Sequence, residues 1–185
     1  MVTSLVCIDF INEIVDVAGK LAGKGYHSFT QKHGTLKKLA KKQEEVRSAG
    51  GRVIHIRLGF ENDYSDHPAR SPLLGGARGA GILQIGTWST EIHSTVAPGT
   101  GDIVLVKKRI SAFYGTNLEA TLRSLNCENL IIAGVATDIA VQSAARDAHD
   151  RDFAVQVAAD LCAAASDEDH ERALENLGKF AKVVH

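Results

Sequence analysis

The sequence predicts a three-layer, doubly wound α/β fold around a mainly parallel sheet of six strands, and three observations support this prediction. Short apolar runs of strand length alternate with amphipathic stretches of helix length. The order strand, helix, strand recurs along most of the chain, which is typical of a parallel sheet covered by helices on both faces. The 185 residues are 44% hydrophobic and 23% charged, as in a globular protein with one buried core. We therefore expect a single domain over residues 1–185, with right-handed crossovers.

Six apolar runs are predicted to form the sheet. They cover residues 5–11, 53–58, 102–108, 129–135, 153–159 and 181–184.

The predicted helices lie between these runs and show recognisable start and stop signals. Leu36, Leu39, Gln43 and Val46 share one helix face, and Gly50-Gly51 ends that helix. Further helices are predicted from Thr116, whose spacing to Glu119 is that of a capping box, along the small-residue stretch 140–148, and from Ser166 with Asp169.

The segment 59–101 has no strong period, and it contains all three prolines and several glycines. An irregular stretch of this length inside a compact domain is usually functional. We expect it to close over a site or to reach a partner subunit.

Composition and charge exclude several classes of partner. The net charge of −1 favours neither nucleic acid nor an anionic membrane, and no apolar run reaches the ~18 residues that span a bilayer. No basic region precedes an apolar one at the N-terminus, so we expect no signal peptide and a cytoplasmic location. Three cysteines without a CxxC pair suit reduced thiols better than disulfides or a zinc site.

Three polar features follow three different predicted strands. Asp9 ends the first, Lys108 ends the third, and residues 134–140 join the fourth to a helix. Ligands of such sheets bind beyond the carboxyl ends of the strands, where all three features would meet. A lysine beside a carboxylate holds it and tunes its proton affinity, and free N–H groups at a helix start favour negative charge. Each feature also has a structural interpretation: a loop-capping aspartate, a basic strand end facing water, and an ordinary strand-to-helix turn.

Together these features carry a resemblance to a known family. The strings IDFINE around Asp9, KKRISAFYGTNLE around Lys108 and GVATDIAVQSAARDAHDR around Ala140 resemble the isochorismatase-like (cysteine hydrolase) family. The strings HIRLGF, HPARSPLL and LQIGTWSTEIH are similar to its amidohydrolase branch, so the resemblance extends over nearly the whole chain. It implies a Rossmann-like fold, hydrolysis of a small amide or ureide C–N bond, and a homo-oligomer, either dimer or tetramer.

The resemblance also implies roles for individual residues. Asp9 matches the family's general acid or base, and Lys108 matches the lysine of its catalytic triad. The bond between Val135 and Ala136 matches a non-proline cis peptide that orients oxyanion donors, which we expect at Val135, Ala136 and Ala140. The family's nucleophilic cysteine matches Ala140, whose methyl group cannot attack, ionise or donate.

Three explanations for Ala140 stay open. The residue could be a Cys→Ala replacement that traps substrate, because the surrounding strings still match an active family member. Alternatively, the protein could lack the thiol naturally and cleave a vinyl ether by protonation from Asp9, as the isochorismatase branch does. Finally, the chain could be a ligand-binding or scaffold protein without catalytic activity.

Other polar and aromatic residues are candidates for contact with a small-molecule substrate. They are Asn12, Arg57, Trp88, Phe113, Tyr114 and Thr137. His55 is more simply a strand-face residue. The family's metal-binding members need an Asp-x-His spacing, whereas Asp66 and His67 are adjacent and His93 stands alone, so we expect no metal and no cofactor.

Overall fold

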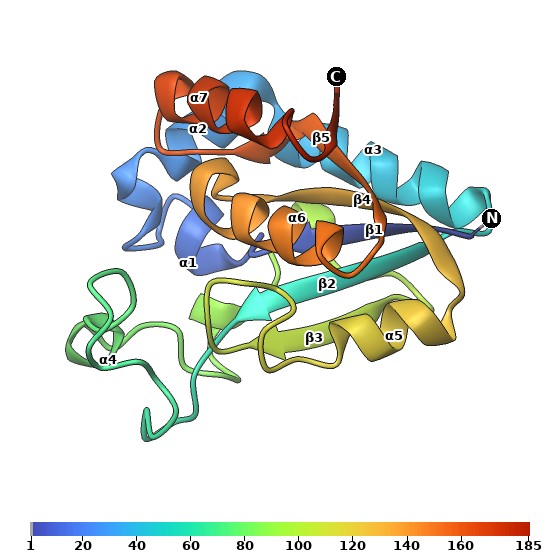
Figure 1. The fold of residues 1–185 in the computed structure, drawn as a ribbon. Helices are drawn as coiled ribbons and strands as arrows, with labels where there is room; N and C mark the ends of the chain where they lie inside the picture. Colours follow the sequence, from blue (N-terminus) through green and yellow to red (C-terminus); the bar gives the residue numbers. More distant parts are fainter. Residues whose placement is uncertain (1) are drawn as a thin grey trace.

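The computed structural model describes residues 2–185 and confirms the predicted α/β fold with a six-stranded sheet. The strand order is β3-β2-β1-β4-β5-β6, and every pair of neighbouring strands is parallel. The strands are β1 (Val2–Ile8), β2 (Arg52–Leu58), β3 (Ile103–Lys107), β4 (Cys127–Val135), β5 (Ala154–Ala163) and β6 (Lys182–Val184). Figure 1 shows the carboxyl ends of the central strands on the left of the molecule, opposite the N-terminus.

The centre of the sheet is where the chain reverses its winding direction. Strand β1 pairs with β2 on one side and β4 on the other. Gly134 faces Ile8 across the β1–β4 pair, and a Cβ at Gly134 would lie only 2.9 Å from the Ile8 Cβ. A glycine here therefore permits the close approach that brings the ends of β1 and β4 together. Such a switch point is where α/β sheets bind ligands.

Helices cover both faces of the sheet, as predicted. The bounds of the helices are α1 (Asn12–Val15), α2 (Tyr26–His33), α3 (Thr35–Ser48), α4 (Ala77–Ala80), α5 (Leu118–Ser124), α6 (Gln142–His149) and α7 (Asp167–Leu177). Helices α1, α2 and α3 contribute to the hydrophobic cluster on one face, and α5, α6 and α7 contribute to the cluster on the other. Within residues 2–185, none of these helices has the length and apolar character needed to traverse a bilayer.

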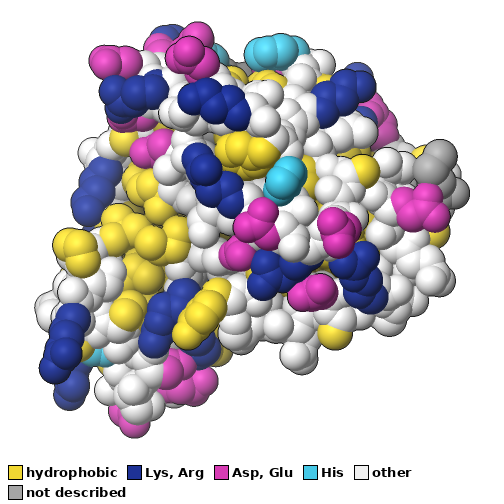
Figure 2. Space-filling view, viewed as in Figure 1, with side chains coloured by type: hydrophobic (Ala, Val, Ile, Leu, Met, Phe, Trp, Pro, Cys, Tyr) yellow, Lys and Arg dark blue, Asp and Glu magenta, His cyan; other side chains and the backbone are white. Residues whose placement is uncertain are grey.

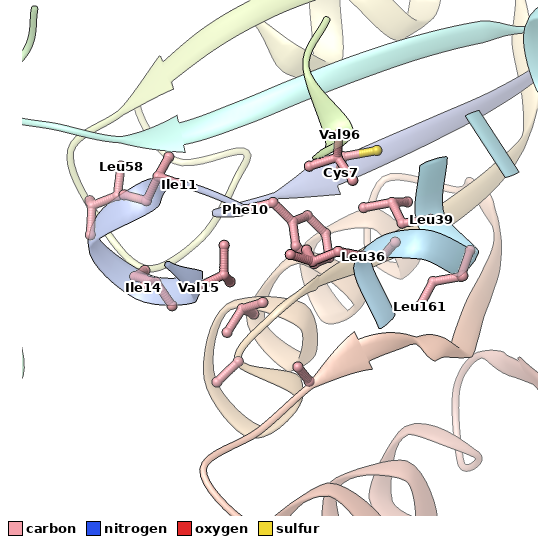
Figure 3. Packing of buried hydrophobic residues seen from close by; sticks show 14 of the residues in the cluster. Cys7, Phe10, Ile11, Ile14, Val15, Leu36, Leu39, Leu58, Val96 and Leu161 are labelled. Carbon is pink, nitrogen blue, oxygen red and sulfur yellow. The ribbon is translucent and has the colours of Figure 1, made fainter. Parts of the chain in front are cut away.

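The apolar face of α3 follows the predicted pattern. Leu36, Leu39, Gln43 and Val46 are all buried. Leu36 and Leu39 lie near the ring of Phe10, which follows β1 (Figure 3). The same cluster continues through Ile14 toward the carboxyl ends of the strands, so the core extends to the region where a site is expected.

The segment 59–101 is more ordered than its sequence suggests. It contains α4 and the short 3₁₀ helices η2 (Trp88–Thr90) and η3 (Ser94–Val96). Phe60 is fully buried and forms an isolated bridge with Gln84. Tertiary contacts of apolar side chains thus order this segment, although its sequence has no hydrophobic periodicity. Figure 1 shows α4 apart from the sheet at the lower left.

Several predicted boundaries shift. The first strand ends at Ile8, not at residue 11, and the third ends at Lys107. The Ser166 cap is confirmed, because its side chain accepts a hydrogen bond from the Asp169 N–H at 3.1 Å. A helix does begin near Thr116, at Leu118, but the predicted capping box with Glu119 is wrong: the Thr116 hydroxyl accepts from the Leu118 N–H at 3.2 Å instead.

Candidate active site

A pocket opens at the carboxyl ends of β1, β3 and β4. Its lining residues are Asp9, Ile14, Leu21, Lys24, Tyr26, Leu58, Leu73, Leu74, Lys107, Arg109, Ile110, Val135, Ala136, Ile139 and Ala140. Figure 2 shows hydrophobic side chains gathered on this left side of the molecule, with Lys or Arg side chains on either side of them. The pocket therefore has apolar walls with a small number of charged groups, which is typical of small-molecule sites.

Asp9 lies directly after β1 and is almost completely buried. Its N–H donates to the carbonyl of Ile56 at 2.8 Å, so β2 holds the backbone in place. The backbone of Asp9 is left-handed, with φ of 60°. Aspartate tolerates this region better than most side chains, yet it is sparsely populated and such residues cluster at functional sites. The turn at Asp9 places its carboxylate in the pocket.

Lys107 is the charged partner of Asp9. Its Nζ lies 2.7 Å from Oδ2 of Asp9, and both side chains are buried, with exposures of 1% and 4%. The ammonium also donates to the carbonyls of Ile110 at 2.7 Å and Arg109 at 3.2 Å. These three acceptors match the three N–H bonds of a lysine, which explains how a full charge is accommodated in the interior.

The prediction that Lys108 pairs with Asp9 is wrong. The Nζ of Lys108 instead lies 2.7 Å from Asp66 and 3.1 Å from Glu61, at the surface. Successive side chains of a strand point to opposite sides, so two adjacent lysines cannot both face Asp9. A shift of one residue in the predicted strand end changed which lysine faces the pocket.

The two oxygens of Asp9 have different surroundings. Oδ2 binds Lys107, whereas Oδ1 is buried without a hydrogen-bond partner among residues 2–185. Burial raises the pKa of Asp9 above its usual value. The charge of Lys107 and its hydrogen bond, together with the backbone of Leu58, oppose this shift without cancelling it. Lys107 therefore holds one oxygen of the carboxyl group, the other oxygen is unpaired within residues 2–185, and the proton affinity of the group is higher than normal.

The turn after β4 forms another part of the pocket lining. The peptide bond between Val135 and Ala136 is cis, and a π-helical turn (Thr137–Val141) follows it and runs into α6. Val135, Ala136 and Ala140, the three residues predicted as oxyanion donors, all line the same pocket as Asp9.

None of the three thiols lines the pocket. All three cysteines are buried, and burial raises the pKa of both Cys7 and Cys162 to about 12. A thiol in that state is not a nucleophile at neutral pH. Ala140, which does line the pocket with Asp9, carries only a methyl group.

The six predicted substrate contacts lie outside the lining of this pocket. Asn12 donates to the carbonyl of Trp88 at 3.1 Å, and Arg57 points toward the carbonyl of Thr90 at 3.5 Å. The Trp88 side chain is 44% exposed and does not wall the pocket. Asn12 of α1 and Arg57 of β2 therefore both contact the backbone of segment 59–101.

The other three predicted contacts are explained by packing or exposure. Phe113 is buried with its ring centroid 6.2 Å from that of Phe153, and Tyr114 is 66% exposed. Thr137 is buried, with its hydroxyl 2.8 Å from Nδ1 of His170. Thr137 therefore links the turn after β4 to α7.

The pocket also contains residues that the sequence did not single out. Lys24 and Tyr26 come from a stretch without a predicted role, Leu73 and Leu74 come from segment 59–101, and Arg109 follows β3. The string KKR, which places Arg109 two residues beyond Lys107, is the sequence signal that could have pointed to Arg109, although Arg109 lies past the end of β3. The segment 59–101 does cover part of the site, as expected.

His55 belongs to a polar network that does not line the pocket. His55 Nε2 lies 3.0 Å from buried Asp102, which also binds Arg47 at 2.6 Å. Burial lowers the pKa of His55. Through Asp102, which directly precedes β3, the network links β2 and α3. In the part of the chain from residue 2 onward, no group of three or more His, Cys, Asp or Glu side chains is arranged to hold a metal.

Comparison with known proteins gives a consistent picture. Residues 3–185 match the isochorismatase domain. The chain is 32% identical to an uncharacterized isochorismatase family protein, YecD, from Escherichia coli O157:H7, over 95% of this chain and 87% of that protein. It is 30% identical to the ureidoacrylate amidohydrolase RutB of Agrobacterium fabrum, over 79% and 69% of the two chains.

Solved structures show the same similarity. An isochorismatase-like hydrolase from Alkaliphilus metalliredigens superposes with a TM-score of 0.83 at 26% identity, covering 99% of this chain and 94% of the other. N-carbamoylsarcosine amidase from Thermoplasma acidophilum superposes with a TM-score of 0.75 at 27% identity, covering 99% and 95%.

Proposed function

Because the chain belongs to the isochorismatase family of hydrolases, we propose that its pocket is built to hydrolyse a small amide or ureide C–N bond. The observation that carries this proposal is the buried Asp9–Lys107 pair, which lines the same pocket as Ala140. The amidohydrolase and amidase names of two relatives support the choice of bond.

The proposed chemistry divides the work among three positions. A thiol at position 140 would attack the carbonyl carbon, and Asp9 would take its proton on the free Oδ1. Asp9 would then protonate the departing amine, and water would release the acyl group. Lys107 holds Oδ2, so the carboxyl group keeps one orientation through both proton transfers. The turn from Val135 to Ala140 would stabilise the oxyanion.

With alanine at position 140, this covalent route is closed. Loss of the nucleophile in a comparable hydrolase lowers the rate by roughly 10⁶. Since no buried thiol lines the pocket, we expect almost no amide hydrolysis from the chain as written.

A second reaction is favoured by the state of Asp9. Burial raises the pKa of Asp9, which increases the protonated fraction of the carboxyl group. A neutral carboxylic acid with a free Oδ1 can protonate a vinyl ether directly, and this step needs no thiol. Isochorismate hydrolysis by Asp9 alone is therefore the alternative, and substrate binding without turnover is the third possibility.

One set of variants separates these reactions. The unmodified chain and Ala140→Cys are assayed for ammonia release from small amides and ureides, and for turnover of isochorismate. Ala144→Cys, which places a thiol at a buried position of α6 outside the pocket, is the matched control. Asp9→Asn is introduced into each active background.

The expected result is ammonia release by Ala140→Cys alone, abolished by Asp9→Asn. No gain over a broad amide panel would refute the amidohydrolase proposal. Isochorismate turnover by the unmodified chain would support the alternative. A ligand that raises the melting temperature of the unmodified chain and of Ala140→Cys, without turnover by either, would indicate a binding protein.

The homo-oligomer and the cytoplasmic location stay predictions. Trp88, Leu73 and Tyr114 are exposed apolar or aromatic side chains that a partner subunit could cover. Light scattering coupled to size-exclusion chromatography measures the assembly directly.

A further inference from the structure

The charges that line the pocket are not balanced. Lys24, Lys107 and Arg109 are cationic, and Asp9 is the single acidic residue of the lining. Lys107 and Asp9 neutralise each other at 2.7 Å. The remaining walls are mostly apolar, so two positive charges are left without a counter-charge inside the pocket.

Lys24 is the first of these two charges. It is the last residue of the 3₁₀ helix η1 (Ala22–Lys24) and is exposed to solvent. Within residues 2–185 its ammonium makes no hydrogen bond and no ion pair. The nearby Lys20, by contrast, donates to the carbonyl of Ala80 at 2.7 Å and does not line the pocket.

Arg109 is the second charge, and it is half-buried. Its Nη1 donates to the carbonyls of Lys108 at 2.7 Å and Asp66 at 2.9 Å, which orient the guanidinium. No carboxylate of residues 2–185 lies within ion-pair distance of it, and its Nε and Nη2 groups have no partner there. Arginine presents several N–H donors in a planar arrangement that suits a carboxylate. Two carbonyls thus hold Arg109 in place and leave donors available.

We propose that Lys24 and Arg109 bind the carboxylate of an anionic substrate whose reactive carbonyl lies against Asp9. This inference rests on the proposed function and adds the substrate class: a small amide or ureide acid, in place of a neutral amide. Leu21, Leu73 and Ile110 line the same pocket and would contact the short carbon chain of such a molecule. Hydrogen bonds to a charged partner strengthen binding, so each cation should contribute about 10- to 100-fold in affinity.

The test compares binding of matched anionic and neutral ligands by calorimetry. Ureidoacetate and ureidoacetamide differ only in the charged end, and the corresponding pairs of succinamate with succinamide and malonamate with malonamide extend the panel. The unmodified chain is used, because Ala140 prevents covalent turnover and leaves the pocket intact. Lys24→Gln and Arg109→Gln remove one charge each. Lys20→Gln and Lys108→Gln are the matched controls, because neither residue lines the pocket.

We expect at least one acid to bind about 10-fold or more tightly than its neutral partner, with an affinity that falls as salt is added. Lys24→Gln and Arg109→Gln should each weaken binding of the acid and leave the affinity for the neutral ligand unchanged. Both control variants should bind every ligand with the affinity of the unmodified chain. Equal affinity for acid and neutral ligand, equal losses in the controls, or no binding of any acid would overturn the inference.

Activity of Ala140→Cys distinguishes failure of this inference from failure of the proposed function. Hydrolysis of neutral amides with no preference for acids would refute the anion site and support the amidohydrolase. Selective binding of acids with no hydrolysis by Ala140→Cys would support the anion site and refute the amidohydrolase.

Discussion

Replacing Lys107 with methionine removes the partner of Asp9 and keeps most of the apolar length of the side chain. The two charges are 2.7 Å apart, and their side chains are 1% and 4% exposed. At an effective dielectric constant of about 20, their attraction at that distance is about 6 kcal/mol. Desolvation opposes this attraction, and burial in fact outweighs Lys107 in setting the pKa of Asp9. Removing one partner of a buried pair leaves the desolvation cost uncompensated and typically lowers the free energy of unfolding by about 3–5 kcal/mol.

Lys108→Met is the matched control for this change. Lys108 is 27% exposed and pairs with Asp66 and Glu61 at the surface, so its loss should cost at most about 1 kcal/mol. Urea unfolding of both variants at pH 7 measures the difference. Equal losses in the two variants would refute the assignment of Lys107 as the buried partner.

The pH dependence of the stability loss in Lys107→Met is a second test of the Asp9–Lys107 interaction. Asp9 has a raised pKa in the folded protein, so it binds protons more readily folded than unfolded, and its contribution to stability decreases as pH rises. Without Lys107 the pKa of Asp9 should rise further, and the destabilisation of Lys107→Met should be larger at pH 8 than at pH 5. Adding Asp9→Asn to Lys107→Met should recover part of the loss. A loss that is independent of pH, or strictly additive in the double variant, would show that the two charges do not interact.

The remaining predictions concern the framework around the pocket. Gly134→Ala should destabilise the protein by about 1–3 kcal/mol in urea unfolding, because its Cβ would lie 2.9 Å from that of Ile8; an unchanged midpoint would contradict the close approach of β1 and β4. Ser166→Ala should lower stability by about 1 kcal/mol in the same assay through loss of the α7 cap, and no loss would mean that the cap is dispensable. A thiol reagent at pH 8 should label none of the three buried cysteines in the folded protein and all three in urea, since the pKa values of Cys7 and Cys162 are raised to about 12; rapid labelling of folded protein would contradict their burial.

Hydrophobic pattern predicted the elements of the sheet well, because burial on a parallel sheet requires local apolar runs. The same pattern placed Asp9 and the turn before Ala140 at one edge of the sheet, where both are found. It did not predict α2, whose sequence YHSFTQKH has few apolar residues. The small apolar face of α2 is buried only because neighbouring elements pack against it, and the local sequence does not show that packing.

The pocket walls were harder to predict. None of the six expected substrate contacts lines the pocket, while Lys24, Leu73 and Arg109 do. These residues come from loops and a short 3₁₀ helix, whose paths depend on contacts between distant parts of the chain. The choice between Lys107 and Lys108 failed for a related reason: strand periodicity reverses the side-chain direction with every residue, so an error of one position moves a side chain to the other face.

The sequence alone determined the fold class, the family, the position of Asp9 and the absence of a thiol at Ala140, because each is encoded in a contiguous string of residues. Only the tertiary structure decided which lysine pairs with Asp9, which oxygen of Asp9 is free, and which cations remain unpaired in the pocket. Those properties depend on distances between residues that are far apart in the chain. Charge pairing and desolvation act through space, and the order of residues does not specify them until the chain is folded.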